Sequence, residues 1–250
     1  MSVLIKGLKR YAPPILVIII IVIFWHFYAE ALGIQIILPT PQSVLMVFDK
    51  KLGLLLRNLM VTLREAVVGI ILGTVIGFGS SVAIQHFRPL RHTLYPILVG
   101  INTLPKSTLA PIFVLWFGAG FLSTMLLVVM VVFFPVLLST ISGFENIDPE
   151  ELILMRSFGA SEIMIFRKLE IPSIAPFFFD GLRVGVAASF GTAIVGELVA
   201  GNAGLGYIIS VAGTQMTIDL MFAAIGLLIP VAIVFYYAIS MFCDHLLYWK

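Results

Sequence analysis

The feature that most constrains this chain is a series of long apolar segments with almost no charge. Six of them reach the roughly 20 residues that a helix needs to cross a bilayer, and they run over 12–33, 62–85, 94–117, 122–142, 174–200 and 220–242. Hydrophobic residues make up 60% of the 250 residues and charged residues 11%, whereas a soluble domain carries about 25% charged residues. The sequence therefore predicts an all-α integral membrane protein, a single domain over 1–250 with about six transmembrane helices.

The residues that enzymes and metal sites need are scarce. Cys243 is the single cysteine, and the four histidines are scattered without metal-binding spacing. The net charge of +2 is too small to indicate nucleic acid as a partner. No GxxxxGK[ST] loop that could cradle nucleotide phosphates occurs in the sequence. We expect no catalytic residue, no metal site and no cofactor in this chain.

The distribution of lysine and arginine predicts the orientation, because these residues collect on the cytoplasmic side. If the N-terminus is cytoplasmic, the inner segments hold Lys6, Lys9, Arg10, Arg88, Arg91, Arg156, Arg167, Lys168 and Lys250. The outer side holds Lys50, Lys51, Arg57 and Arg64. Nine cations against four place both termini in the cytoplasm. An alternative for the first span is a signal peptide cleaved after Ala29-Glu30-Ala31, although its apolar run is long for one.

Two further patterns bear on the packing of the spans. After Leu38-Pro39-Thr40-Pro41, Ser43 is a candidate N-cap for a short amphipathic helix on the outer surface. Glycines recur every four residues at Gly69, Gly73 and Gly77, and again at Gly181 and Gly185. Such stripes allow close approach of helices in lipid. They serve either packing within one chain or packing between two copies.

The most charged connection is residues 143–172, between the fourth and fifth spans. Asp148 is a candidate N-cap, followed by Pro149 at the first helical position and two glutamates in the first turn. Ser161 is a second candidate cap. The pattern predicts two short helices on the cytoplasmic face, joined at 157–161.

This connection resembles the signature loop of binding-protein-dependent ABC importer permeases, in its sequence MRSFGAS, FRKLEIPS and GLRVG. Gly159 matches the glycine characteristic of that family, and 169–172 matches its closing apolar-Pro element. The resemblance implies a type I importer permease fold with a coupling helix that docks on an ATPase subunit. The residues expected to dock are Glu150, Glu151, Met155, Arg156, Ser157, Phe158, Gly159, Ala160 and Ser161.

One departure from the family pattern lies in the same loop. The family has Glu-Ala-Ala before the glycine, whereas this chain has Ile153-Leu154-Met155. Glu150 or Glu151 is a candidate substitute for the missing glutamate. Elsewhere the resemblance covers nearly the whole chain, including 38–41, 109–118, Glu197-Leu198 and 204–207. These segments look like the subfamily that handles nitrate, sulfonates, taurine, bicarbonate and some pyrimidine or vitamin precursors.

The resemblance also implies partners and a location. We expect two ABC ATPase subunits that bind ATP and Mg, an extracytoplasmic substrate-binding protein, and a second copy of this chain. The location implied is the bacterial inner membrane.

Polar residues inside the spans are candidates for the translocation path, because ionisable groups there are costly. Lys106 lies in the third span between Pro105 and Pro111, with Asn102, Thr103 and Ser107 close by in sequence. It is either a contact for a small polar or anionic solute or a structural lysine bound by carbonyls that the prolines free. Glu197, near the outer end of the fifth span, is a candidate for gating or for contact with the binding protein.

The hypothesis is therefore the permease subunit of an ATP-driven importer, and not an enzyme. The alternative is a secondary transporter working alone, which predicts paired broken helices in two inverted halves. Only the third span has that pattern. A membrane-embedded enzyme would need polar residues clustered at one depth, and this sequence does not contain such a cluster.

Overall fold

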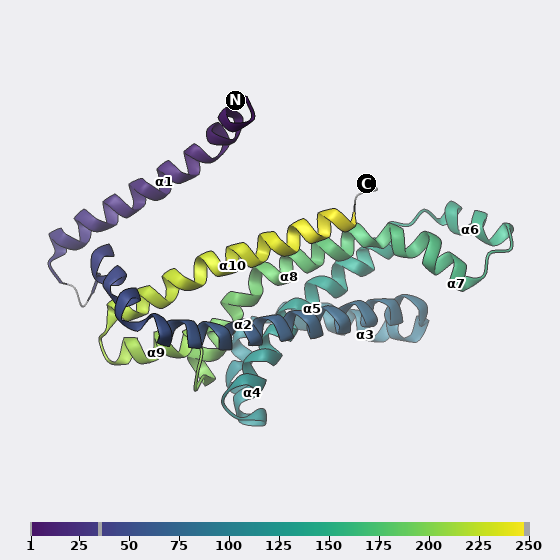
Figure 1. Ribbon diagram of the computed structural model, residues 1–250. Helices are drawn as coiled ribbons and strands as arrows, with labels where there is room; N and C mark the ends of the chain where they lie inside the picture. The colour runs from purple at the N-terminus through teal and green to yellow at the C-terminus, as the bar shows by residue number, and fades with distance from the viewer. Residues whose placement is uncertain (1, 35–36, 248–250) are drawn as a thin grey trace. The chain divides into compact units, whose positions relative to one another are not determined.

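Every element in the described part of the chain is a helix (Figure 1). The computed structural model describes the backbone of residues 2–34 and 37–247, and the side chains of that part except 2–12, 14, 15, 88 and 200. The elements are α1 (Ser2–Leu32), α2 (Pro41–His86), α3 (Arg88–Asn102), η1 (Lys106–Leu109), α4 (Ala110–Phe117), α5 (Phe121–Glu145), α6 (Pro149–Ser157), α7 (Glu162–Ile165), η2 (Phe166–Glu170), α8 (Ile171–Ala200), α9 (Leu205–Thr214) and α10 (Ile218–Leu246).

Among these residues, four helices are long and apolar enough to cross a membrane: Pro41–His86, Phe121–Glu145, Glu162–Val199 and Ile218–Leu246. A fifth span exists if the pair Pro89–Asn102 and Lys106–Phe117 is counted as one, bent by 95°. The sequence predicts six. Within the expected span 12–33, the described side chains form a shorter apolar helix over Leu16–Leu32. It is shorter because the side chains of residues 12, 14 and 15 lie outside the described part.

The expected third span, 94–117, is not a single straight helix. The helix ends at Asn102 and resumes at Lys106, with Pro105 extended between them (φ −61°, ψ 115°). Proline removes a backbone donor and disfavours helical geometry at the preceding residue. The break therefore follows from the proline that the sequence analysis noted.

The amphipathic segment before the second span also differs from expectation. Thr40, rather than Ser43, caps the helix, because its hydroxyl accepts a hydrogen bond from the Ser43 N–H at 3.3 Å. The helix begins at Pro41 and is continuous with the second span except at Lys51, whose φ of −126° and ψ of 18° are not helical. A proline at the first helical turn suits this start, since its missing N–H would be unpaired there anyway.

The described residues form two compact units, one over 1–56 with 208–227 and one over 57–207 with 228–250. In the first, the Trp25 indole N–H donates to the Pro39 carbonyl at 3.0 Å. The same ring packs against Phe222 with centroids 5.6 Å apart. The exposed large apolar side chains of α1 range from 38% at Leu32 to 69% at Phe24. Such exposure is expected of a surface in contact with lipid.

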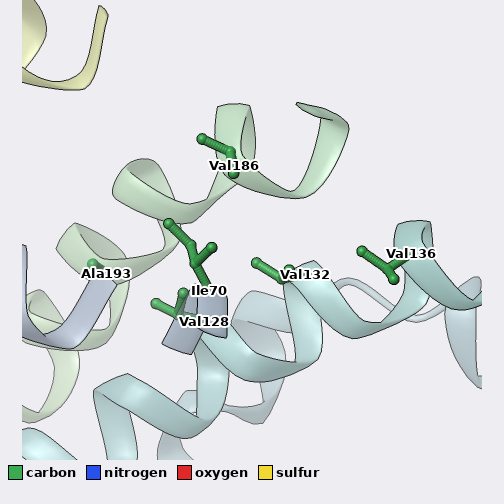
Figure 2. Close-up of a cluster of buried hydrophobic side chains, with 6 residues drawn as sticks. All are labelled: Ile70, Val128, Val132, Val136, Val186 and Ala193. Atoms are coloured by element: carbon green, nitrogen blue, oxygen red, sulfur yellow. The ribbon is translucent and has the colours of Figure 1, made fainter. Parts of the chain in front are cut away.

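In the second unit, glycines of α2 and α8 pack against α5, which runs beside α8 (Figure 1). A Cβ added at Gly73 would lie 2.8 Å from the Val132 Cβ, and one at Gly185 would lie 3.0 Å from the Val132 Cα. Both glycine stripes therefore pack within the chain. The valines lie along α5 in Figure 2, with Ile70 of α2 and Val186 of α8 beside them.

This packing predicts a position-specific cost for adding one methyl group to α2. Gly73→Ala places a Cβ 2.7 Å from the Val129 carbonyl oxygen, and overpacking of this kind costs about 1–3 kcal/mol. Gly79→Ala in the same helix meets nothing within 4 Å and is the matched control. We expect thermal unfolding of the purified protein in detergent to shift to lower temperature only for Gly73→Ala. Equal shifts for both variants would refute close packing at Gly73.

Candidate functional site

The charged connection has the two capped helix starts that the sequence predicts, but the second is not a separate short helix, because it continues into α8. The Asp148 carboxylate accepts a hydrogen bond from the Glu150 N–H at 2.8 Å, and the Ser161 hydroxyl accepts one from the Met164 N–H at 3.3 Å. Between them Gly159 has a φ of +73°, a conformation that favours glycine. The turn at Gly159 therefore reverses the chain between α6 and α7.

Several large apolar side chains of α6 and of the turn after it are exposed. Phe158 is 82% exposed, Ile153 66% and Leu154 57%. Glu150, Glu151 and Ser157 are exposed as well, whereas Met155 and Ala160 are half-buried. A cluster of large apolar side chains at a helix turn is costly in water, so it marks a surface that a partner covers.

The segment is joined to the membrane helices without a flexible linker. From Glu162 to Val199 the chain is one helix, which includes the π-helical stretch η2 at Phe166–Glu170. Arg156 of α6 pairs with Glu162 of α7 at 3.3 Å. An exposed ion pair therefore links α6 to the helix that continues into α8.

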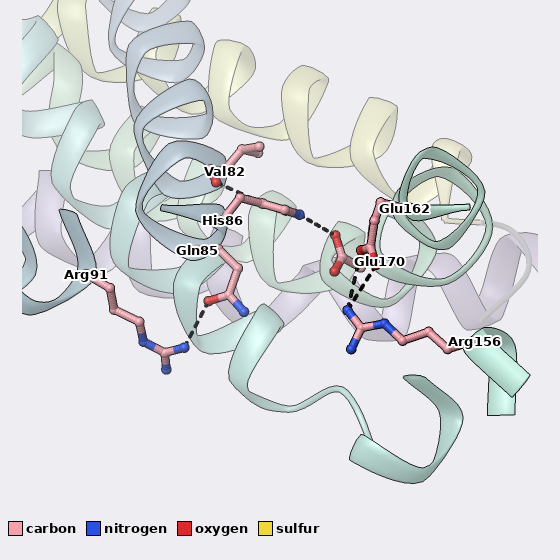
Figure 3. Close-up of polar contacts among 7 residues, drawn as sticks. All are labelled: Val82, Gln85, His86, Arg91, Arg156, Glu162 and Glu170. Carbon is pink, nitrogen blue, oxygen red and sulfur yellow. Dashed lines mark hydrogen bonds and ion pairs between the residues drawn. The ribbon is translucent and has the colours of Figure 1, made fainter. Parts of the chain in front are cut away.

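A second connection runs to α2 through His86 (Figure 3). Its Nε2 lies 3.2 Å from the Glu170 Oε2, and its Nδ1 lies 3.0 Å from the Val82 carbonyl. The ring also packs edge-on against Phe144 and Phe166, with centroids 6.0 and 5.7 Å away. His86 was not among the residues that the sequence analysis selected.

The candidate path residues gather at the break between α3 and η1. The Lys106 ammonium donates to the Asn102 backbone carbonyl and, at 2.8 Å, to the Asn102 Oδ1. It also lies 5.1 Å from the centroid of the Phe134 ring. A lysine that binds the last carbonyls of a helix stabilises its C-terminus, so Lys106 has a structural role here. Thr103 and Ser107, on either side of the break, are exposed.

Glu197 makes its hydrogen bonds in a different place, which we call the polar clamp. The clamp consists of Asn58, Thr62 and Glu65 on α2, Glu197 on α8, and the backbone amides of Gly204, Leu205 and Gly206. All four side chains are buried, with Glu65 2% and Glu197 1% exposed.

Each amide of the turn finds one acceptor in the clamp. The Gly204 N–H donates to the Asn58 Oδ1 at 2.8 Å, the Leu205 N–H to the Thr62 Oγ1 at 3.0 Å, and the Gly206 N–H to the Glu197 Oε2 at 2.5 Å. One carboxylate oxygen of each glutamate, Glu65 Oε2 and Glu197 Oε1, is buried without a hydrogen-bond partner among the described residues. The clamp therefore ties the turn between α8 and α9 to α2.

The glycines of this turn are required by the same contact. Gly204 has a φ of +106°, and a side chain there would overlap the Glu197 carboxylate. The sequence analysis selected Glu197 but missed its partners on α2. Their spacing, Asn58, Thr62 and Glu65, puts three polar groups on one face of an otherwise apolar helix, and that signal was available.

Removal of the Glu197 carboxylate should destabilise the protein. Glu197→Ala leaves the buried Gly206 amide without its acceptor, at a cost of about 1–3 kcal/mol for an unpaired buried group. Asp49→Ala removes an exposed carboxylate and serves as the control. We expect a lower unfolding temperature in detergent for Glu197→Ala alone. An unchanged unfolding temperature would show that the clamp contributes nothing to stability.

The comparisons with known proteins agree with this architecture. The family described as binding-protein-dependent transport system inner membrane component matches residues 69–244. A probable ABC transporter permease protein of Haemophilus influenzae is 33% identical over 92% of this chain and 95% of its own length. The formylaminopyrimidine transport permease protein ThiX of Halalkalibacterium halodurans is 32% identical over 95% of each chain.

A solved structure has the same fold. A chain of the MetNI methionine ABC transporter, in an inward-facing conformation, superimposes with a TM-score of 0.66. The match covers 80% of this chain and 97% of that chain at 20% sequence identity. This protein therefore belongs to the binding-protein-dependent inner membrane components and is the permease subunit of an ABC importer.

Proposed function

We propose that α6 and α7 form the surface on which the ATPase subunit of the importer docks. The exposed apolar side chain of Phe158 at the turn between them is the observation that carries this proposal. Its neighbours in the docking surface are Glu150, Glu151, Met155, Arg156, Ser157, Gly159, Ala160 and Ser161. ATP and Mg are bound by the ATPase, so this chain contributes the path and the coupling.

Two structural connections support a role in coupling. Arg156 holds α6 to α7 through Glu162, and α7 continues into α8 as one helix. His86 joins the same region to the end of α2. A movement imposed at Phe158 by the ATPase is thus delivered to two membrane helices at once. In this arrangement, closure of the ATPase subunits rearranges the membrane helices α2 and α8.

The missing family glutamate affects the charge of the docking surface. Ile153 stands at its position and is 66% exposed. Glu150 and Glu151 lie in the first turn of α6, one turn or less before it. They supply negative charge at the helix N-terminus, where it is favourable. We propose that one of them takes the contact that the family makes with its glutamate.

The path itself requires a second copy of the chain. Thr103 and Ser107 are exposed beside a break at which helical hydrogen bonding is interrupted. Polar groups and irregular backbone at membrane depth are tolerated only against protein or water. A second copy that covers this break would enclose a polar path lined by Asn102, Thr103, Lys106 and Ser107 for a small polar or anionic solute. Glu197 acts in this scheme by holding the turn after α8.

The proposed assembly is therefore two copies of this chain, two ATPase subunits and an extracytoplasmic binding protein. The bacterial inner membrane, with both termini in the cytoplasm, is the proposed location. Five of the nine cations behind that orientation (Lys6, Lys9, Arg10, Arg88 and Lys250) have side chains outside the described residues.

Truncation of Phe158 tests the docking surface. Phe158→Ala removes an apolar side chain that is 82% exposed, and truncation of such an anchor costs about 2 kcal/mol or more in interfaces. Leu115→Ala in α4 removes an apolar side chain of equal exposure, 82%, and is the control. We expect co-purification of the cognate ATPase, and its activity in the complex, to fall at least about tenfold for Phe158→Ala only. Full retention by this variant would reject the docking surface.

Thiol labelling tests the path. Cys243 is fully buried, so a cysteine introduced elsewhere reports its own surroundings, with Cys243→Ser as the background. We expect Ser107→Cys and Thr103→Cys to react with a membrane-impermeant maleimide in the assembled importer, because the path holds water. Leu115→Cys, equally exposed but facing lipid, should not react. Protection of both path cysteines would place them in lipid or in packed protein and contradict the proposal.

A further inference from the structure

One face of the continuous helix formed by α7, η2 and α8 carries two cavities, one after the other. The first is an open apolar cavity of about 400 Å³. It is lined by Phe78 of α2, by Ile171, Ala175, Phe178 and Phe179 of α8, and by Leu246 of α10. Its walls are almost entirely carbon, and Leu246 and Phe179 belong to the ends of their helices nearest to α7.

The second cavity lies one turn earlier along the same helix and is cationic. It is open, measures about 580 Å³ and is lined by Ser161, Ile163, Met164, Arg167 and Lys168. Arg167 and Lys168 precede Ile171 by four and three residues, so they neighbour the apolar cavity. Both are exposed, and neither takes part in an ion pair or side-chain hydrogen bond among the residues that the structure describes.

The order of these features matches one kind of molecule. An acyl chain fits an apolar cavity at the level of the spans, and a phosphate headgroup fits two free cations at the rim. We propose that this face binds an anionic phospholipid, with its headgroup on Arg167 and Lys168 and one acyl chain in the apolar cavity, against Phe78 and Phe178. The assignment to the inner leaflet rests on the proposed orientation of the permease.

The position of this site gives it a consequence for coupling. The cations belong to η2, the segment between the docking helices and the membrane part of α8. A bound headgroup would fix this segment at the membrane surface, on the same helix as Glu170 and its His86 contact. The lipid would thus stabilise the position from which α6 and α7 meet the ATPase.

Native mass spectrometry of the purified full-length chain, titrated with phosphatidylglycerol or phosphatidylethanolamine, tests the proposal. We expect the wild type to retain phosphatidylglycerol in preference to phosphatidylethanolamine. Arg167→Gln with Lys168→Gln should reduce that preference by about 30-fold, because each cation near an anionic surface contributes about a factor of five. Lys50→Gln with Lys51→Gln, which removes two exposed cations elsewhere, is the matched control and should change nothing. Ala175→Phe, which fills the apolar cavity, should lower retention of both lipids.

Three outcomes would overturn the site. These are equal retention of the two lipids by the wild type, an unchanged preference in the Arg167/Lys168 double variant, and complete displacement of bound phosphatidylglycerol when the ATPase is added. The last would assign the two cations to the ATPase interface. The first two outcomes are read from lipid bound to the chain alone, so they do not depend on ATPase binding. Failure of the wild-type chain to bind the ATPase, with its lipid preference retained, would reject the proposed docking surface and leave the lipid site standing.

Discussion

The close approach of α2 and α8 to α5 is the constraint on which the rest of the second unit depends. Lipid is as apolar as a leucine side chain, so helices in a membrane gain little from hydrophobic burial and rely on contact. Gly73 and Gly185 let two helices reach Val132 from different directions. Each dispersion contact between two atoms of such surfaces is weak, but the many contacts together contribute a large attraction. The valines of α5 that pack against these glycines also lose little side-chain entropy on packing, because the χ1 angle of valine in a helix is already restricted.

If α6 and α7 dock on the ATPase as proposed, this close contact would carry their movement to the whole unit. Helices packed without voids transmit displacement instead of absorbing it. The docking helices have a continuous covalent path into α8 and a side-chain path through His86 into α2. The polar clamp fastens the turn after α8 to α2. The two helices that flank α5 are therefore tied at both the η2 region and the α8–α9 turn, which favours their movement as a body.

Much of the candidate site could be predicted, and the reasons for success and failure are physical. Asp148, Pro149 and Ser161 predict their helix starts because capping is a local interaction within three residues. The sequence leaves Lys106 between two roles, and the structure adds its hydrogen bond to Asn102, four residues away. The other side chains of the clamp were missed, because Asn58 and Glu65 lie more than 130 residues before Glu197 in the chain. No local pattern indicates which turn such distant groups will bind.

The sequence by itself determined that the chain lies in a membrane, that it is helical, which family it belongs to, and where the turn at Gly159 lies. These follow from apolar length, from proline and glycine, and from motifs whose physics acts within a few residues. The tertiary structure decided that the glycine stripes serve one chain, that the third span is bent by 95°, and that Glu197 is buried in a clamp. Each of these depends on which helix lies against which, and that depends on close contacts between residues far apart in the chain.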